Sequence, residues 1–194
     1  MTETSLSLLE RLRLQPDADS WQRLVDLYTP LLRTWLRRHG LADADVDDLV
    51  QDVLVVVIRR LPQFEHNRHR GAFRCWLRAI VANRLREFHR ARQSRPLATG
   101  DSDFIARLEQ LEDPASDLSR LWDAEHDRHV VQRALELLQP HFEPATWQAF
   151  RRTAHDGVPA AEVAAELGTS VNAVLLAKSR VLRRLRQEVQ SLTG

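Results

Sequence analysis

Hydrophobic residues recur three and four positions apart along residues 71–92, a spacing that predicts one amphipathic helix. Polar and cationic residues fall on the opposite side of this helix. A row of guanidinium groups suits a phosphate backbone, although the same pattern also fits a solvated helix. The apolar stripe consists of Phe73, Trp76, Leu77, Ile80, Val81, Leu85 and Phe88, and the polar side of Arg78, Asn83, Arg86, His89 and Arg90.

The same periodicity predicts three helices before this one. They cover residues 5–14, 20–40 and 45–61, with a break or kink at Pro30 in the second. Asp19 or Ser20 is expected to cap the second helix, and Asp43 or Asp45 the third. Pro62 is expected to end the third helix, and residues 64–72 are expected to form a polar loop.

The helical pattern weakens between residues 94 and 121, where Pro96, Gly100 and Pro114 interrupt it. Residues 104–112 are expected to form one or two helical turns. The stretch is interpreted as a linker with transient or docked structure. A second helical array follows, with segments expected at 123–138, 144–155, 159–167 and 170–190.

Composition supports an all-α protein with two small helical domains joined by a linker. The chain has 194 residues, 43% of them hydrophobic, and contains only six glycines and one tyrosine. Leu, Ala, Arg and Glu, all good helix formers, dominate it. The predicted division is residues 1–93, a linker at 94–122, and a C-terminal helix-turn-helix domain at 123–194.

The overall charge of +1 hides a strong asymmetry. Residues 93–127 hold nine acidic residues and three arginines, a net charge of −6, so the two flanks together carry +7. This distribution predicts basic modules tied by an acidic connector.

Sites for metals, cofactors and catalysis are not predicted. Cys75 is the only cysteine, so neither an intrachain disulfide nor a zinc knuckle is expected. His126 and His129 have no nearby residue that completes a metal site. Paired catalytic carboxylates, Ser-His-Asp spacing and phosphate-binding loops are absent, so an enzyme is not expected. The sequence shows no signal peptide or membrane-spanning run, which predicts a cytoplasmic protein without membrane insertion.

Residues 159–185 carry the pattern of a helix-turn-helix, with an ordinary helical hairpin as the alternative. A short helix reaches Gly168 at a tight turn, and Ser170 is placed to cap a longer helix. Ala164 permits close helix approach. The small core between the helices is expected to contain Val163, Leu167, Val171 and Val174. The residues expected to face DNA are Ser170, Asn172, Ala173, Leu176, Ala177, Lys178, Arg180, Arg183 and Arg184.

The helix at 45–61 has an acidic side that suits a basic protein partner. Capping of the helix N-terminus, together with solvation, would account for the same residues without any partner. The residues that share this side are Asp45, Asp48, Gln51, Asp52 and Arg59.

The order of these elements resembles the bacterial RNA polymerase sigma factors of the extracytoplasmic-function class. The strongest matches are DVDDLVQDV at residues 45–53 and FRCWLRAIVANRLREFHR at residues 73–90. The resemblance implies that the chain binds core RNA polymerase and promoter DNA and directs transcription initiation, without a cofactor. Any anti-sigma factor would be a separate protein. A stand-alone helix-turn-helix regulator is the alternative.

By this resemblance, specific residues acquire roles. The residues expected to bind core polymerase are Asp45, Asp48, Gln51 and Asp52. The residues expected to bind the −35 element are the DNA-facing helix-turn-helix residues named above. Trp76 belongs to the apolar stripe of its helix, and for that reason it is expected to pack in the core rather than to stack on a base. The residues expected to melt and capture the −10 element are His66, Asn67, Arg68, Arg70, Arg74, Arg78, Asn83, Arg84, Arg86 and Arg90.

The chain departs from the family pattern at two places. Leu175 stands where a basic residue is usual in the recognition helix, which leaves the register of base contacts open. The connector is also longer and more acidic than is typical. The family's linker threads the polymerase, and an acidic segment suits a basic channel built for nucleic acid; neutralising its acids should then change abortive initiation.

Overall fold

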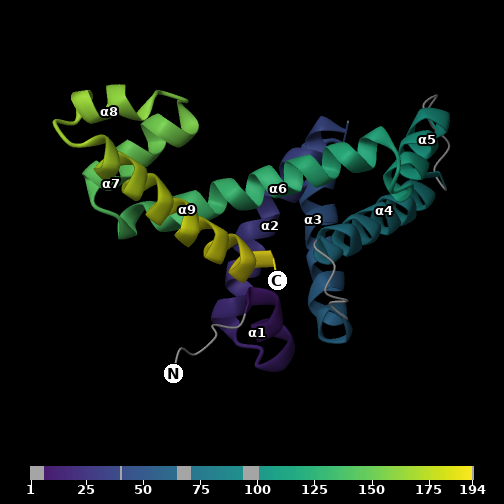
Figure 1. The fold of residues 1–194 in the computed structure, drawn as a ribbon. Helices are drawn as coiled ribbons and strands as arrows, with labels where there is room; N and C mark the ends of the chain where they lie inside the picture. Colours follow the sequence, from purple (N-terminus) through teal and green to yellow (C-terminus); the bar gives the residue numbers. More distant parts are fainter. Residues whose placement is uncertain (1–6, 40, 65–70, 94–100, 194) are drawn as a thin grey trace. The chain divides into compact units, whose positions relative to one another are not determined.

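A computed structural model describes residues 7–39, 41–64, 71–93 and 101–193, and these residues form helices and turns without a β-strand (Figure 1). The predicted all-α class is therefore confirmed. The chain divides into two compact units, one of residues 1–129 with 193–194 and one of residues 130–192. Each unit is described separately below.

Six helices contribute to the described part of unit 1. Consecutive members of the set α1 to α5 pack on one another, and α6 begins in this unit and ends in unit 2. Their bounds are α1 Leu8–Leu14, α2 Ala18–Arg38, α3 Asp43–Arg60, α4 Ala72–Gln93, α5 Asp101–Glu112 and α6 Asp117–Leu138. The predicted helix at 71–92 thus corresponds to α4 within a residue at each end.

The helix starts differ from two of the predicted caps. Asp17 caps α2 by accepting a hydrogen bond from the Ser20 backbone N–H at 2.7 Å, so Asp19 and Ser20 lie inside the helix. Ala42 is the N-cap of α3 and makes no side-chain cap. Asp43 and Asp45 lie in its first turn instead, where a negative charge interacts favourably with the positive end of the helix dipole.

Pro30 lies within α2, and the helix continues through it to Arg38. A break, which was one of the two outcomes predicted at Pro30, is therefore not found. Leu27 and Leu31 on either side of the proline are buried, while Pro30 itself is exposed. Burial of the turns before and after Pro30 holds the helical path despite the lost backbone hydrogen bond.

The core of unit 1 includes residues from the predicted linker. Trp35 of α2 and Trp122 of α6 are 2% and 1% exposed and meet edge to face, with ring centroids 5.1 Å apart. Tyr28 is also buried, and burial raises the pKa of its hydroxyl, which therefore stays protonated. Its oxygen lies 3.4 Å from Nε2 of His126.

The segment predicted to be a weakly structured linker contains α5 and the start of α6. Leu108 and Leu111 of α5 are buried, and Phe104 stacks on His89 of α4 at 4.5 Å between ring centroids. The docked form of the linker is therefore the one observed, and the expectation of only one or two helical turns is wrong.

Unit 2 contains the end of α6 and three further helices, and its predicted segments all form. The bounds are α7 Pro144–Phe150, followed by a π-helical segment Arg151–His155, α8 Ala160–Glu166 and α9 Val171–Thr193. Val163 and Val174 are buried as predicted, and Leu167 is partly buried against them. Ala164, predicted to permit close helix approach, is buried as well, together with Ala149 and Ala177. Val171 is 44% exposed, so its predicted place in this core is wrong.

No single helix among the described residues has both the length and the apolar composition to cross a membrane. By length and composition alone, α8 and α9 pass that test as a bent pair.

Candidate functional site

The exposed side of α3 combines acidic and apolar residues. Val46, Leu49 and Val53 face the core of unit 1. The opposite side of the helix is exposed, and we call it the α3 acidic face. Val55 and Ile58 on the same exposed side are 42% and 38% exposed. The α3 acidic face comprises Asp48, Gln51, Asp52 and Val55, spaced as one side of a helix requires.

Ion pairing divides the acids of α3 into two groups. Among the described residues, Asp48 and Asp52 form no ion pair. Asp45 does not belong to the α3 acidic face, because its side chain is only 18% exposed and is ion-paired with Arg92. The paired acids are Asp43 with Arg37 at 2.7 Å, Asp47 with Arg33 at 2.8 Å, and Asp45 with Arg92 at 2.8 Å.

Two arginines predicted to contact the −10 element bind acids of α6 instead. Arg78 is 6% exposed at its side chain, and its Nη1 lies 3.1 Å from Oδ1 of Asp123. Arg74 lies 2.7 Å from Asp127 and 3.4 Å from Asp123. We call these four residues the α4–α6 cluster. Arg78 is therefore not part of an exposed cationic surface, and its predicted role is corrected.

Sequence reasoning missed this cluster, although a signal for it existed. Arg74 and Arg78 are four residues apart on α4, and Asp123 and Asp127 are four apart on α6. Such pairs lie on one side of each helix, so two facing helices can match them. The Trp122 indole N–H also donates to the Arg74 carbonyl oxygen at 3.3 Å, which fixes the same contact.

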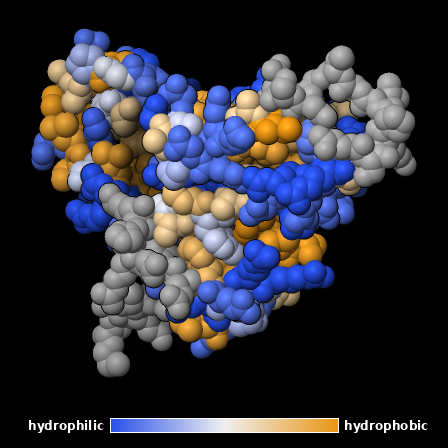
Figure 2. Space-filling view, turned by 90° about the vertical axis from the view of Figure 1, so that its right-hand side faces the viewer, coloured by the Kyte–Doolittle hydropathy of each residue, from blue (hydrophilic) through white to orange (hydrophobic). Residues whose placement is uncertain are grey.

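The remaining described members of the predicted −10 set lie further along α4. Asn83 and Arg90 are exposed, whereas Arg84 and Arg86 are half-buried. Arg86 bonds to Asn83 and is ion-paired with Glu112 of α5. The predicted residues His66, Asn67, Arg68 and Arg70 lie outside the described residues. Figure 2 shows the molecule from the side on which Figure 1 draws α4 and α5. The surface seen there is mainly hydrophilic, with smaller apolar patches.

Trp76 and Cys75 occupy different environments near the start of α4. Trp76 is half-buried and packs on Phe64 and Phe73, with ring centroids at 4.8 Å and 5.5 Å. This packing agrees with the predicted core role. Cys75 is a free, exposed thiol.

Helices α8 and α9 meet at 107° through a four-residue turn. A helix-turn-helix has an angle of about 90–120°. Gly168 has a φ of +62°, a conformation that favours glycine, and the backbone N–H of Ala173 donates to the Ser170 hydroxyl at 3.2 Å. The predicted turn and cap are both present.

The predicted DNA-facing residues of α9 do not all share one environment. Ala177 is 8% exposed and belongs to the core of unit 2, which removes it from the predicted set. Lys178 is half-buried, and Ser170 is exposed with its hydroxyl engaged as the cap. The exposed members are Asn172, Ala173, Leu176, Arg180, Arg183 and Arg184.

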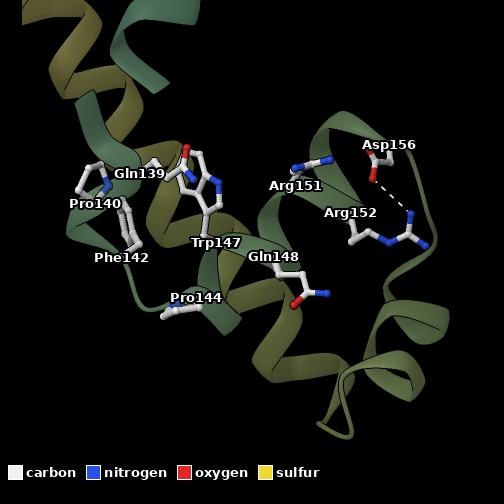
Figure 3. A pocket seen from close by; sticks show the side chains of 9 residues that line it. All are labelled: Gln139, Pro140, Phe142, Pro144, Trp147, Gln148, Arg151, Arg152 and Asp156. Atoms are coloured by element: carbon white, nitrogen blue, oxygen red, sulfur yellow. Dashed lines mark hydrogen bonds and ion pairs between the residues drawn. The ribbon is translucent and has the colours of Figure 1, made fainter. Parts of the chain in front are cut away.

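Two hollows lie on unit 2. One, of about 360 Å³, is lined by His141 and Phe142 and by Arg180, Arg183 and Arg184 of α9. The other, of about 720 Å³, has an ion pair at its rim between Arg152 and Asp156, with 3.2 Å between Nη1 and Oδ2 (Figure 3). Its lining residues are Gln139, Pro140, Phe142, Pro144, Trp147, Gln148, Arg151, Arg152 and Asp156.

Comparison with known proteins decides the family. The family described as Sigma-70 region 2 matches residues 24–95. The RNA polymerase sigma factor NccH of Alcaligenes xylosoxydans xylosoxydans is 31% identical over 187 residues, covering 94% of this chain and 92% of NccH. The chain belongs to the RNA polymerase sigma factors. The sigma factor CnrH of Cupriavidus metallidurans is 32% identical over 157 residues, covering 78% of this chain and 77% of CnrH.

This sigma factor is of the extracytoplasmic-function class, as its likeness to NccH and CnrH supports. It directs transcription initiation, and a stand-alone regulator is not favoured. Proteins of this kind are in general non-enzymatic regulators. The match to Sigma-70 region 2 spans α3 and α4, the two helices that carry the acidic face and the arginines.

Proposed function

We propose that this sigma factor docks on core RNA polymerase through the α3 acidic face and works in the cytoplasm without a catalytic role of its own. The single observation that carries the proposal is the division of the α3 acids. Three of them pair with arginines of their own unit, whereas Asp48 and Asp52 form no ion pair within the described part of the chain. Exposed Val55 adds apolar contact beside these charges. Such a surface suits a basic protein partner.

Promoter contact is divided between two helices in this proposal. Helix α9 enters the major groove of duplex DNA at the −35 element, which is supported by the angle between α8 and α9 and by the Ser170 cap. Residues 66–70, which lie outside the described residues, and the C-terminal half of α4 open the −10 element. Asn83, Arg86 and Arg90 supply the polar contacts there, spaced along one side of the helix.

Strand opening requires no cofactor in this proposal. Unstacking a base costs a few kcal/mol, and phosphate contacts together with a base-binding pocket offset that cost. Arg74 and Arg78 act indirectly, because they hold α6 against α4 through Asp123 and Asp127. Their proposed role is to fix the position of α4 relative to α6.

The test is binding of the purified chain to core RNA polymerase. The double variant Asp48→Arg, Gln51→Ala reverses charge on the α3 acidic face at exposed positions, so folding should be preserved. We expect tight binding by the parent chain and a loss of at least tenfold in the variant. Asp26→Arg is the matched control, since Asp26 is exposed on α2 and lies outside both α3 and the linker, and it should bind like the parent.

Two results would contradict the proposal. Absence of polymerase binding by the folded parent would overturn docking altogether. Equal weakening by the double variant and by Asp26→Arg would show a general charge effect in place of a defined face.

A further inference from the structure

The exposed side of α9 carries an apolar residue, Leu176, in the first turns of the helix. Val174, Ala177 and Val181 are buried and define the inward side of the helix. At 100° per residue, the opposite side is occupied by a row spaced four, three and four residues apart. We call this row the α9 outward stripe, and it comprises Asn172, Leu176, Ser179 and Arg183.

Leu176 contributes nothing to the core of unit 2. Its side chain is 49% exposed, in the first turns of a helix whose opposite side already supplies the core residues. Leu175 is exposed to a similar extent, 50%, but lies about 100° around the helix from Leu176. The two leucines therefore provide a matched pair that differs in direction.

The charge of α9 indicates which partner covers this stripe. Residues 171–187 contain no acidic residue, and the cationic residues among them are Lys178, Arg180, Arg183, Arg184 and Arg186. Arg183 belongs to the stripe itself, and none of these arginines forms an ion pair within the described part of the chain. All of these cations follow Leu176 along the helix. An exposed apolar residue followed by unpaired cations suits a polyanion that also presents an apolar group.

Duplex DNA offers such a group in its major groove. The thymine C5 methyl is contacted there by apolar side chains, and asparagine bonds to the N6 and N7 atoms of adenine. Asn172 lies one turn before Leu176 on the same stripe. We infer that Leu176 recognises a thymine methyl and that the −35 element carries an A·T pair beneath the stripe. This inference rests on the proposed function, the entry of α9 into the major groove.

The experiment has two stages and uses the chain bound to core polymerase. In the first, this complex selects duplexes from a random-sequence library, which gives the upstream element that it prefers. In the second, each thymidine of that element is replaced singly by deoxyuridine, which removes only the C5 methyl. Affinity is then measured for the parent chain, Leu176→Ala, Leu176→Met and Leu175→Ala.

The parent should lose about fourfold in affinity at one position on removal of the methyl, from the transfer free energy of one such group. Leu176→Ala should bind the thymidine and deoxyuridine duplexes equally. Leu175→Ala and Leu176→Met should keep the parent's preference.

Three outcomes would overturn the inference. They are equal binding of all single deoxyuridine duplexes by the parent, a preference for thymidine that survives Leu176→Ala, and a loss of the preference in Leu175→Ala alone. Failure of the first stage to yield any upstream element would instead count against the proposed −35 function. The two failures are therefore distinguishable.

Discussion

Helices α4 and α9 both present rows of arginines opposite an apolar side, yet these arginines have different surroundings. Near the start of α4, Arg74 and Arg78 are ion-paired with acids of α6, and Arg78 is buried. On α9, Arg183 and Arg184 are exposed and unpaired within the described residues. A cationic helix side thus serves packing in one unit and remains available to a ligand in the other.

The difference comes from the partner helix and not from the arginines. Helix α6 brings Asp123 and Asp127 to the spacing of the α4 arginines, and Trp122 anchors the contact with a side chain that is 1% exposed. Separation of the two helices would expose this indole together with Trp35. The cost of exposing two such side chains is large, so the α4–α6 cluster is a structural contact.

The largest effect that tests this comparison is the loss of a buried charge partner. Arg78→Ala leaves Asp123 partly buried without its closest cation, and removal of one member of a buried pair costs about 3 kcal/mol. We expect the free energy of unfolding, measured with urea, to fall by about that amount. Arg183→Ala is the control, and an exposed position of this kind should change stability by less than about 0.5 kcal/mol. Similar small changes in both variants would remove the distinction between the helices.

The second effect concerns DNA affinity. Arg183→Ala and Arg184→Ala should each lower the slope of log affinity against log salt by about 1, as the loss of one phosphate contact does. Titrations of the selected promoter duplex at several salt concentrations measure this slope. Arg120→Ala, at an exposed arginine of unit 1, should leave it unchanged. An unaltered slope in both α9 variants would mean that these arginines do not contact phosphate.

A third, smaller effect distinguishes the two ends of α4. Arg86 is 32% exposed and pairs with Glu112, so Arg86→Ala should cost less than about 1 kcal/mol of stability. Promoter opening by the holoenzyme, followed by permanganate reactivity of unpaired thymines, should nevertheless decrease. A loss of stability as large as that of Arg78→Ala would make the whole of α4 structural.

The smallest effect is a dependence on pH in the acid range. The hydrogen bond between His126 and Asp127, and to a lesser extent the Arg74 guanidinium, lowers the pKa of Asp127 from its usual 3.8, against an opposing effect of burial. A carboxyl with a lowered pKa contributes stability above its unfolded pKa and loses it as the pH falls through the folded value. Asp127→Asn should therefore flatten the fall in stability below about pH 4. The Asp127 side chain is 58% exposed, which keeps this effect small. Parallel pH profiles of parent and variant would contradict it.

Periodicity predicted α4, and the residue types Gly168 and Ser170 predicted the α8–α9 turn and its cap, because these features depend on residues close in sequence. It left a break or a kink open at Pro30, where α2 continues unbroken, and it placed Val171 in the core of unit 2, where that residue is exposed. Local patterns contain no information about packing between distant elements.

The candidate site divides in the same way. The sequence predicted the α3 acidic face, but it could not show that Asp45 pairs with Arg92, which is far away in the chain. It placed Arg78 on a polar helix side without revealing that α6 covers that side. A helical wheel gives the direction of a side chain, whereas its availability depends on the element that faces it.

The exposed thiol of Cys75 makes the protein convenient for spectroscopy. It is the sole cysteine in the sequence, and it lies on α4 beside the arginine that holds α6. A maleimide fluorophore would therefore attach at one defined position without any engineering of the chain. The label would report on the surroundings of α4 in real time, as polymerase binds and as the promoter opens.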